Sequence, residues 1–292
     1  MSSYGRSTGA SRRRVPVRVT WTGVRGVRLV GDDWGGDGRP VLLLHGGGQT
    51  RHSWQGTASA LAERGLRPIA LDLRGHGESD WDPEGDYSLD AFVGDLHAVR
   101  AGIGGAPPVL IGASLGGMTA LAAVGESAAP FASALVLVDV TPRLETGGTE
   151  RIKAFMTARP EGFASLDEVA DAVAAYLPGR PRPHDMTGLA RNVRLGEDGR
   201  YRWHWDPRFL GAGRQDLVQR ERPATAARAV GVPTLLVRGV LSDVVSEQGV
   251  AEFLGLIPHA RHADVEGAGH MVAGDRNDAF SDAIFVFLDD VL

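Results

Sequence analysis

The segment Val109–Met118 constrains the possible folds of this chain more than any other stretch. Its first three residues, Val109–Ile111, are apolar and predict a buried parallel strand, and Thr119–Ala123 predicts a helix soon afterwards. Between them lies the pattern G-x-S-x-G, Gly112–Gly116, centred on Ser114. In this context the pattern indicates a sharp strand-to-helix turn that exposes a serine hydroxyl above the sheet. We therefore consider Ser114 a candidate nucleophile.

The pattern alone is a weak signal, because it occurs a second time at Gly5–Gly9. That copy lies within the polar segment 1–14, with no strand before it and no apolar helix after it. We expect residues 1–14 to form a disordered tail, and we find no apolar core of a signal peptide there.

Strands and helices are predicted to alternate along most of the remaining chain. Such an alternation is typical of a mostly parallel sheet with helices on both faces, joined by right-handed crossovers. The predicted strands lie at 15–20, 24–30, 41–44, 68–73, 109–111, 134–138, 233–239 and around 263–265. The predicted helices of this part lie at 54–64, 89–103, 119–123, 246–256 and 277–290.

The alternation is interrupted between residues 141 and 230, where the sequence predicts helices and irregular segments. We expect an α/β core formed by 15–140 and 231–292, with an inserted helical cap at 141–230. Trp203 and Trp205 lie in an otherwise polar part of this cap. They are candidates for an apolar roof over a substrate site, although packing of the cap onto the core would explain them equally well.

Composition limits the class of protein further. The 292 residues suffice for one large α/β domain, or for a core and a small second unit. The chain has no cysteine, which excludes disulfides, thiolate metal sites and a cysteine nucleophile and fits a cytoplasmic location. With a net charge of -5 and no apolar run long enough to span a bilayer, we expect neither nucleic acid nor a membrane as partner.

A serine hydroxyl needs a base within hydrogen-bonding reach and a third group that orients the base. Sites in open parallel sheets form outside the carboxyl ends of the strands. His270 follows the last predicted strand in a glycine-rich loop, and Asp243 follows the strand at 233–239. We predict His270 as the base and Asp243 as the acid. Asp139 also follows a strand directly and remains an alternative acid.

The glycine run after His45 predicts a loop whose backbone N–H groups can face a developing oxyanion. The expected donors are the N–H groups of Gly47 and of Leu115, the residue after the candidate nucleophile. A phosphate-binding loop is excluded here because Gln49 and Thr50 follow instead of the Gly-Lys-Ser/Thr of that motif. No zinc-binding spacing of histidines and carboxylates occurs, so we predict no metal and no cofactor.

With these motifs the chain resembles the α/β-hydrolase fold superfamily, in the serine-nucleophile branch that carries a helical cap. The resemblance covers about residues 15–292 and rests on His45–Gly48, Asp72–Ser79, Gly112–Gly117, Asp243 and Gly267–Met271. It implies an eight-stranded, mostly parallel sheet, with the cap between the sixth and seventh strands. It also implies the chain order nucleophile, acid, histidine, which Ser114, Asp243 and His270 follow.

The resemblance implies a serine hydrolase of the esterase or lactonase kind, with a small-molecule acyl substrate and water as its partners. Ser114 argues against epoxide hydrolases and haloalkane dehalogenases, which carry an aspartate as nucleophile. Three alternatives stay open at this point: a C–C bond hydrolase, a cofactor-free perhydrolase, and a non-catalytic ligand receptor on the same scaffold.

Overall fold

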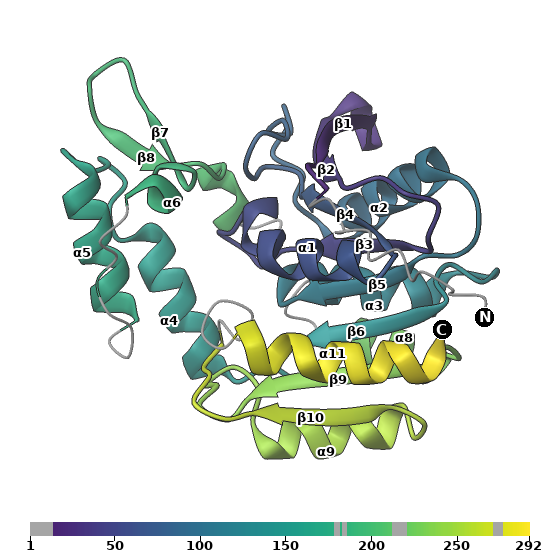
Figure 1. Cartoon of the computed structure of the whole chain (residues 1–292). Helices are drawn as coiled ribbons and strands as arrows, with labels where there is room; N and C mark the ends of the chain where they lie inside the picture. Colours follow the sequence, from purple (N-terminus) through teal and green to yellow (C-terminus); the bar gives the residue numbers. More distant parts are fainter. Residues whose placement is uncertain (1–13, 178–181, 183–185, 212–220, 271–276) are drawn as a thin grey trace, which may run out of the picture.

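The computed structural model describes residues 14–177, 182, 186–211, 221–270 and 277–292 (Figure 1). The predicted tail except Arg14, most of the proline-rich stretch that begins at Pro178, and Met271 lie outside these residues. Within them, no helix combines the length and the apolar character needed to cross a membrane.

An eight-stranded sheet forms the centre of the described molecule. Its strands are β1 (Val17–Thr22), β2 (Arg28–Asp33), β3 (Pro40–Leu44), β4 (Arg67–Asp72), β5 (Val109–Ala113), β6 (Ala134–Val138), β9 (Thr234–Gly239) and β10 (Arg261–Val265). Their order in the sheet is β1-β2-β4-β3-β5-β6-β9-β10. Only β2 runs against the other strands: it pairs antiparallel with both β1 and β4, so β1 points in the same direction as β4. The expected mostly parallel sheet is thereby confirmed.

Helices cover both faces of this sheet, as predicted. They are α1 (Gln55–Glu63), α2 (Leu89–Ile103), α3 (Leu115–Glu126), α8 (Glu221–Ala229), α9 (Glu247–Leu256) and α11 (Asn277–Val291). Two short 3-10 helices, η1 (Val24–Gly26) and η2 (Arg51–Trp54), precede β2 and α1. In Figure 1, α1 and α11 cross in front of the sheet, whereas α3, α8 and α9 lie behind it.

Alternating side chains of the central strands fill two hydrophobic layers. In β3, Leu42 and Leu44 belong to the layer that also contains residues of α2, α3, α8 and α9, whereas Val41 and Leu43 belong to the layer that contains residues of α1 and α11. All four side chains are fully buried. A strand that is buried on both faces reads as a continuous apolar run, which explains why the sequence pattern located the central strands well.

A further group of elements lies between β6 and β9 in the chain and beyond the carboxyl ends of the strands (Figure 1). It consists of α4 (Thr146–Thr157), α5 (Leu166–Tyr176), α6 (Thr187–Ala190), β7 (Val193–Leu195), β8 (Tyr201–Trp203) and η3 (Pro207–Leu210). We refer to residues 146–210 as the cap segment. Strands β7 and β8 form an antiparallel pair within it, where the sequence predicted helical and irregular structure. Helix α8, which falls in the range 141–230, instead packs against α3 of the core.

The first two strands begin later than predicted. Residues 24–26, expected to start the second strand, form η1, in which Arg25 and Gly26 have positive φ angles of 59° and 78°. The backbone N–H of Val24 donates a hydrogen bond to Asp95 Oδ1 (2.8 Å), which fixes this turn. Strand β2 therefore starts at Arg28 and continues to Asp33, because both β1 and β4 pair with it.

The glycines around Ser114 allow three backbone segments to meet, and we expect their substitution to be costly. A methyl group on Gly112 would lie 2.5 Å from the carbonyl oxygen of Gly116 and 2.6 Å from Cα of Gly117. Gly112→Ala should therefore lower the free energy of unfolding by about 2–4 kcal/mol in urea denaturation. Gly255→Ala in α9 is the matched control, because a methyl group there meets no atom within 4 Å. An equal effect of both substitutions would contradict this account.

Candidate active site

Ser114 lies in a strained turn between β5 and α3, as the sequence predicted. Its φ angle is 45° and its ψ angle is -110°. Few non-glycine residues adopt positive φ, and such strain occurs often at functional sites. The turn is held by its backbone: the N–H of Ser114 donates to the carbonyl oxygen of Val138 (3.1 Å), and its own carbonyl accepts from Met118 (2.9 Å).

His270 lies beside Asp139, the alternative acid, and not beside Asp243. The distance between His270 Nδ1 and Asp139 Oδ2 is 2.6 Å, and the Asp139 side chain is fully buried. A carboxylate has no proton and can only accept a hydrogen bond. His270 Nδ1 therefore carries the proton and is the donor. Its Nε2 is then left with the lone pair that a general base requires.

The predicted position of Asp243 beside His270 is wrong. The Asp243 carboxylate forms an ion pair with Arg151 of α4 at 2.9 Å, and both side chains are more than one-third exposed. Gly148, also on α4, packs against the backbone of Asp243, since a methyl group there would lie 2.3 Å from the Asp243 carbonyl oxygen. Asp243 thus joins the cap segment to the loop after β9.

The strand register explains why Asp139 has this position. Ala113 of β5 pairs with Val138 of β6, so the next residues, Ser114 and Asp139, leave neighbouring strands at the same level. Asp243 lies four residues beyond the end of β9, one strand further away. The sequence signal that could have identified the acid is therefore the position of Asp139 directly after β6, the strand that pairs with the nucleophile strand β5.

The glycine loop at 46–48 passes directly over the nucleophile turn. A methyl group on Gly46 would lie 3.4 Å from Ser114 Cβ. The N–H of Gly116 donates to the carbonyl oxygen of His45 (3.1 Å), which ties the loop to the start of α3. No hydrogen bond among the described residues uses the N–H of Gly47 or of Leu115. These two predicted oxyanion donors are therefore free to bind a ligand, as far as the described residues show.

His45 fixes the base of this loop as a neutral imidazole. Its Nε2 accepts a hydrogen bond from the backbone N–H of Leu73 (3.0 Å), so its Nδ1 carries the proton and donates to the carbonyl oxygen of Gly46 (2.8 Å). The ring is fully buried, and burial lowers the pKa of His45 to about 4.

His204 of the cap segment bridges the glycine loop and the loop after β4. Its Nδ1 accepts from the backbone N–H of Gly77 (2.7 Å), and its Nε2 then donates to the carbonyl oxygen of Gly48 (3.3 Å). Burial, with His76 and His45 nearby, lowers the pKa of His204 well below its ordinary value. Sequence reasoning missed this role, because nothing local marks His204 as a contact of a loop 156 residues earlier.

Apolar side chains of the cap segment pack onto the same loop. A methyl group on Gly48 would lie 3.2 Å from Met156 Cε and 3.4 Å from Trp205 Cζ3, and one on Gly47 would lie 3.4 Å from Phe209 Cε1. Trp205 stacks on Trp203, with ring centroids 4.9 Å apart. Trp203 also contacts the rings of two phenylalanines of the cap segment, Phe155 and Phe163. Of the two predicted tryptophans, Trp205 thus packs on the glycine loop and Trp203 packs within the cap segment.

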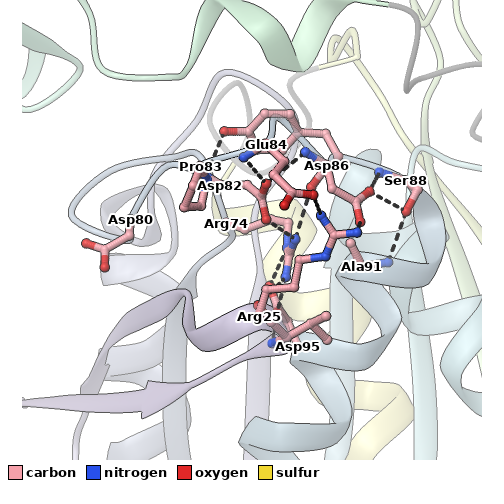
Figure 2. A network of polar contacts seen from close by, with 12 residues as sticks. Arg25, Arg74, Asp80, Asp82, Pro83, Glu84, Asp86, Ser88, Ala91 and Asp95 are labelled. Carbon is pink, nitrogen blue, oxygen red and sulfur yellow. Dashed lines mark hydrogen bonds and ion pairs between the residues drawn. The ribbon is translucent and has the colours of Figure 1, made fainter.

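A buried arginine holds the loop on which the cap segment rests (Figure 2). Arg74 binds both carboxylate oxygens of Asp95 at 2.7 Å and contacts Asp82 Oδ2 at 3.3 Å. Asp82 in turn accepts the backbone N–H groups of Glu84 and Asp86. The carboxylates of Asp82 and Asp95 thus accept hydrogen bonds from Arg74 and from backbone N–H groups, and these bonds stabilise the loop.

The same loop receives the end of the cap segment. Tyr87 Oη donates to Asp206 Oδ2 (2.6 Å), and the backbone N–H of Asp206 donates to the carbonyl oxygen of Gly75 (2.9 Å). Arg208 Nη2 donates to the carbonyl oxygen of Asp82 (2.8 Å). These contacts join the cap segment firmly to the core beside the glycine loop. Nowhere in the described residues do three His, Asp or Glu side chains gather as metal ligands.

Comparison with known proteins places these features in a family. Residues 41–283 match the model of the Alpha/beta hydrolase family. The chain is 32% identical over 265 residues to Esterase Rv0045c of Mycobacterium tuberculosis, covering 88% of this chain and 85% of the relative. It is 27% identical over 260 residues to the 3-hydroxybutyrate-oligomer hydrolase of Cupriavidus necator, covering 83% and 87%. The crystal structure of E-2-(acetamidomethylene)succinate hydrolase has the same fold, with a TM-score of 0.82, 24% identity and coverage of 94% and 99%.

Because His45 and His204 are buried and have lowered pKa values, we predict that the free energy of unfolding decreases in mild acid. Between the ordinary pKa of 6.5 and the lowered pKa of about 4, the unfolded chain binds a proton at His45 that the folded chain does not bind. Stability is therefore fully retained above the ordinary value and is lost as the pH falls below it, by about 2 kcal/mol for His45 from pH 7 to pH 5.

The lowered pKa of His204 should make stability fall with decreasing pH in the same way. His204→Gln should therefore reduce the slope of the unfolding free energy against pH, by an amount that corresponds to at most one proton taken up on unfolding. Urea denaturation at several pH values between 5 and 8 measures this slope. Comparison of both proteins at pH 8, where the imidazole is neutral in both states, separates the slope from any constant loss. An unchanged slope in the variant would disprove the assignment.

Proposed function

The chain belongs to the alpha/beta hydrolase family, and on this premise we propose that it is a serine hydrolase of small or medium ester-like acyl substrates. In this proposal Ser114 is the nucleophile, His270 is the general base, and Asp139 orients His270. The observation that supports it most strongly is the 2.6 Å contact between His270 Nδ1 and the buried Asp139 carboxylate. That contact lies one strand away from the strained turn of Ser114.

The proposed reaction proceeds through an acyl-enzyme. Ser114 Oγ attacks the ester carbonyl carbon while its proton passes to His270 Nε2. The tetrahedral intermediate then collapses, the C–O bond to the alcohol breaks, and His270 returns the proton to the departing alcohol oxygen. A water molecule, deprotonated by His270, attacks the acyl-enzyme in the same way and releases the carboxylic acid and free Ser114. Asp139 stabilises the imidazolium that forms in each half-reaction.

The N–H groups of Gly47 and Leu115 are the proposed donors to the oxyanion. The N–H of Leu115 is at the first position of α3, where a helix N-terminus favours negative charge. Both groups are free of other partners among the described residues. Preorganised donors of this kind typically contribute about 10²–10³ in rate each.

Substrate preference follows from the chemistry beside the glycine loop. Met156, Trp205 and Phe209 are buried apolar side chains that pack on Gly47 and Gly48. The apolar surroundings of the glycine loop are the basis for proposing an acyl group without charge. The naming of the Mycobacterium tuberculosis relative as an esterase supports the ester class, since the two chains align over most of their lengths.

Labelling and turnover test the proposal together. Wild-type protein should form a single adduct with a fluorophosphonate, detected by intact mass, and should hydrolyse p-nitrophenyl acetate, butyrate or octanoate. Ser114→Ala should form no adduct and lose about 10³-fold or more in kcat, because no other group supplies the nucleophile. Folded wild-type protein that neither forms an adduct nor hydrolyses any of these esters would contradict the proposal.

Two matched carboxylate variants test the identity of the acid. Asp139→Asn should lower kcat by about 10³–10⁴, because an amide neither fixes the tautomer of His270 nor stabilises its charged form. Asp243→Asn removes only a half-exposed ion pair with Arg151 and should leave kcat within about threefold. Ester hydrolysis at saturating substrate, with thermal unfolding as a check on folding, measures both. The reverse order of effects would return Asp243 to the role of acid.

A further inference from the structure

We infer that Ser242 is a positioning residue, whose hydroxyl orients the Asp139 carboxylate toward His270. The inference rests on the proposed function and extends it to the loop after β9. This loop, 240–245, is the one in which the sequence placed the acid. In the structure it supplies a hydrogen-bond donor to the acid instead.

Among the residues that the structure describes, three donors surround the Asp139 carboxylate. Ser242 Oγ donates to Oδ2 at 2.5 Å, and His270 Nδ1 donates to the same oxygen at 2.6 Å. The backbone N–H of Gly239, the last residue of β9, donates to Oδ1 at 3.2 Å. In the described part of the chain, neither an arginine nor a lysine forms an ion pair with Asp139, and the neighbouring ionisable group is His270. A fully buried carboxylate of this kind depends on these hydrogen bonds for both its charge and its orientation.

The hydroxyl proton of Ser242 is directed at the Asp139 carboxylate by the other hydrogen bonds of Ser242 Oγ. Its Oγ accepts the backbone N–H groups of Val244 (3.1 Å) and Val245 (3.2 Å). A hydroxyl has two acceptor lone pairs and one proton, so both lone pairs are used and the proton is left for Asp139. The N–H of Ser242 donates to the carbonyl oxygen of Gly239 (2.9 Å), which closes the turn directly after β9. The donor is therefore fixed by the backbone of its own loop.

The expected consequence lies in the geometry of the Asp139–His270 contact. Rotation of a carboxylate about its terminal torsion is soft, and few other constraints act on it. Ser242 and Gly239 each hold one oxygen, which keeps Oδ2 in line with His270 Nδ1. Without the Ser242 hydroxyl, the carboxylate would sample orientations in which His270 is less well aligned. Because Ser242 acts on Asp139 and not on the substrate, kcat should fall while KM changes little.

Ser246 provides a matched control for loss of a serine hydroxyl in the same region. Its Oγ also accepts a backbone N–H, from Gly249 (3.2 Å), and also donates to a carboxylate, Glu145 Oε1 (2.6 Å). It caps α9, and the hydrogen bonds described for Ser246 and for Asp139 do not join the two residues. Ser246→Ala should therefore cost stability of the same kind as Ser242→Ala without the loss in kcat.

The test compares wild type with Ser242→Ala, Ser242→Thr and Ser246→Ala in p-nitrophenyl ester hydrolysis and in urea denaturation. We expect Ser242→Ala to lose about tenfold or more in kcat with KM within about twofold, the size expected for a hydrogen bond to a charged group. Ser242→Thr, which keeps the hydroxyl, should recover most of that loss. A kcat of Ser242→Ala within about twofold of wild type, or an equal loss in Ser246→Ala, would overturn the inference.

Proton NMR gives a readout that does not depend on ester turnover. The Nδ1 proton of an imidazole bound to a buried carboxylate resonates far downfield, so wild type should show this signal and Asp139→Asn should lose it. Ser242→Ala should shift or broaden it, whereas Ser246→Ala should not. An unchanged signal in Ser242→Ala would refute the positioning role. Absence of labelling and turnover in wild type, with the NMR pattern as expected, would refute the hydrolase proposal alone.

Discussion

The pairing of β5 with β6 is the constraint on which the rest of the site depends. Because Ala113 pairs with Val138, Ser114 and Asp139 leave the sheet side by side, with φ angles of 45° and 49°. The ladder continues into both turns, since the N–H of Ser114 binds Val138 and the N–H of Asp139 binds Val237 of β9. Three neighbouring parallel strands thereby fix the nucleophile turn and the carboxylate in one frame.

Burial of the sheet on both faces allows two strained residues, Ser114 and Asp139, to follow the carboxyl ends of neighbouring central strands. Positive φ at a non-glycine residue costs on the order of 1–3 kcal/mol and persists only where the surroundings fix it. Here the central strands lie between two hydrophobic layers, and the residues that line them are almost fully buried. The close approach of α3 to β3 and β5 depends on Gly112 and Gly116, which leave no room for a side chain.

The cap segment and the core build the site together. His204 holds Gly48 and Gly77 in one arrangement, and Trp205 and Phe209 pack on the glycine loop. Tyr87 and Asp206 join the two parts with a buried hydrogen bond. These contacts make the end of the cap segment a support for the proposed oxyanion donors, beyond any role as a cover over the substrate.

The sequence by itself determined the mostly parallel sheet, the turn at Ser114, and the bounds of α2 (Leu89–Ile103) and β6 (Ala134–Val138), which were predicted residue for residue. Each of these depends on apolar periodicity and turn residues within a short stretch of neighbouring positions. The partner of His270 was decided only by tertiary structure. Asp139 and Asp243 both follow strands, and both fit the chain order. The choice between them depends on register across β5, β6 and β9, and on Arg151 of α4 binding Asp243, which are contacts between elements far apart in the chain.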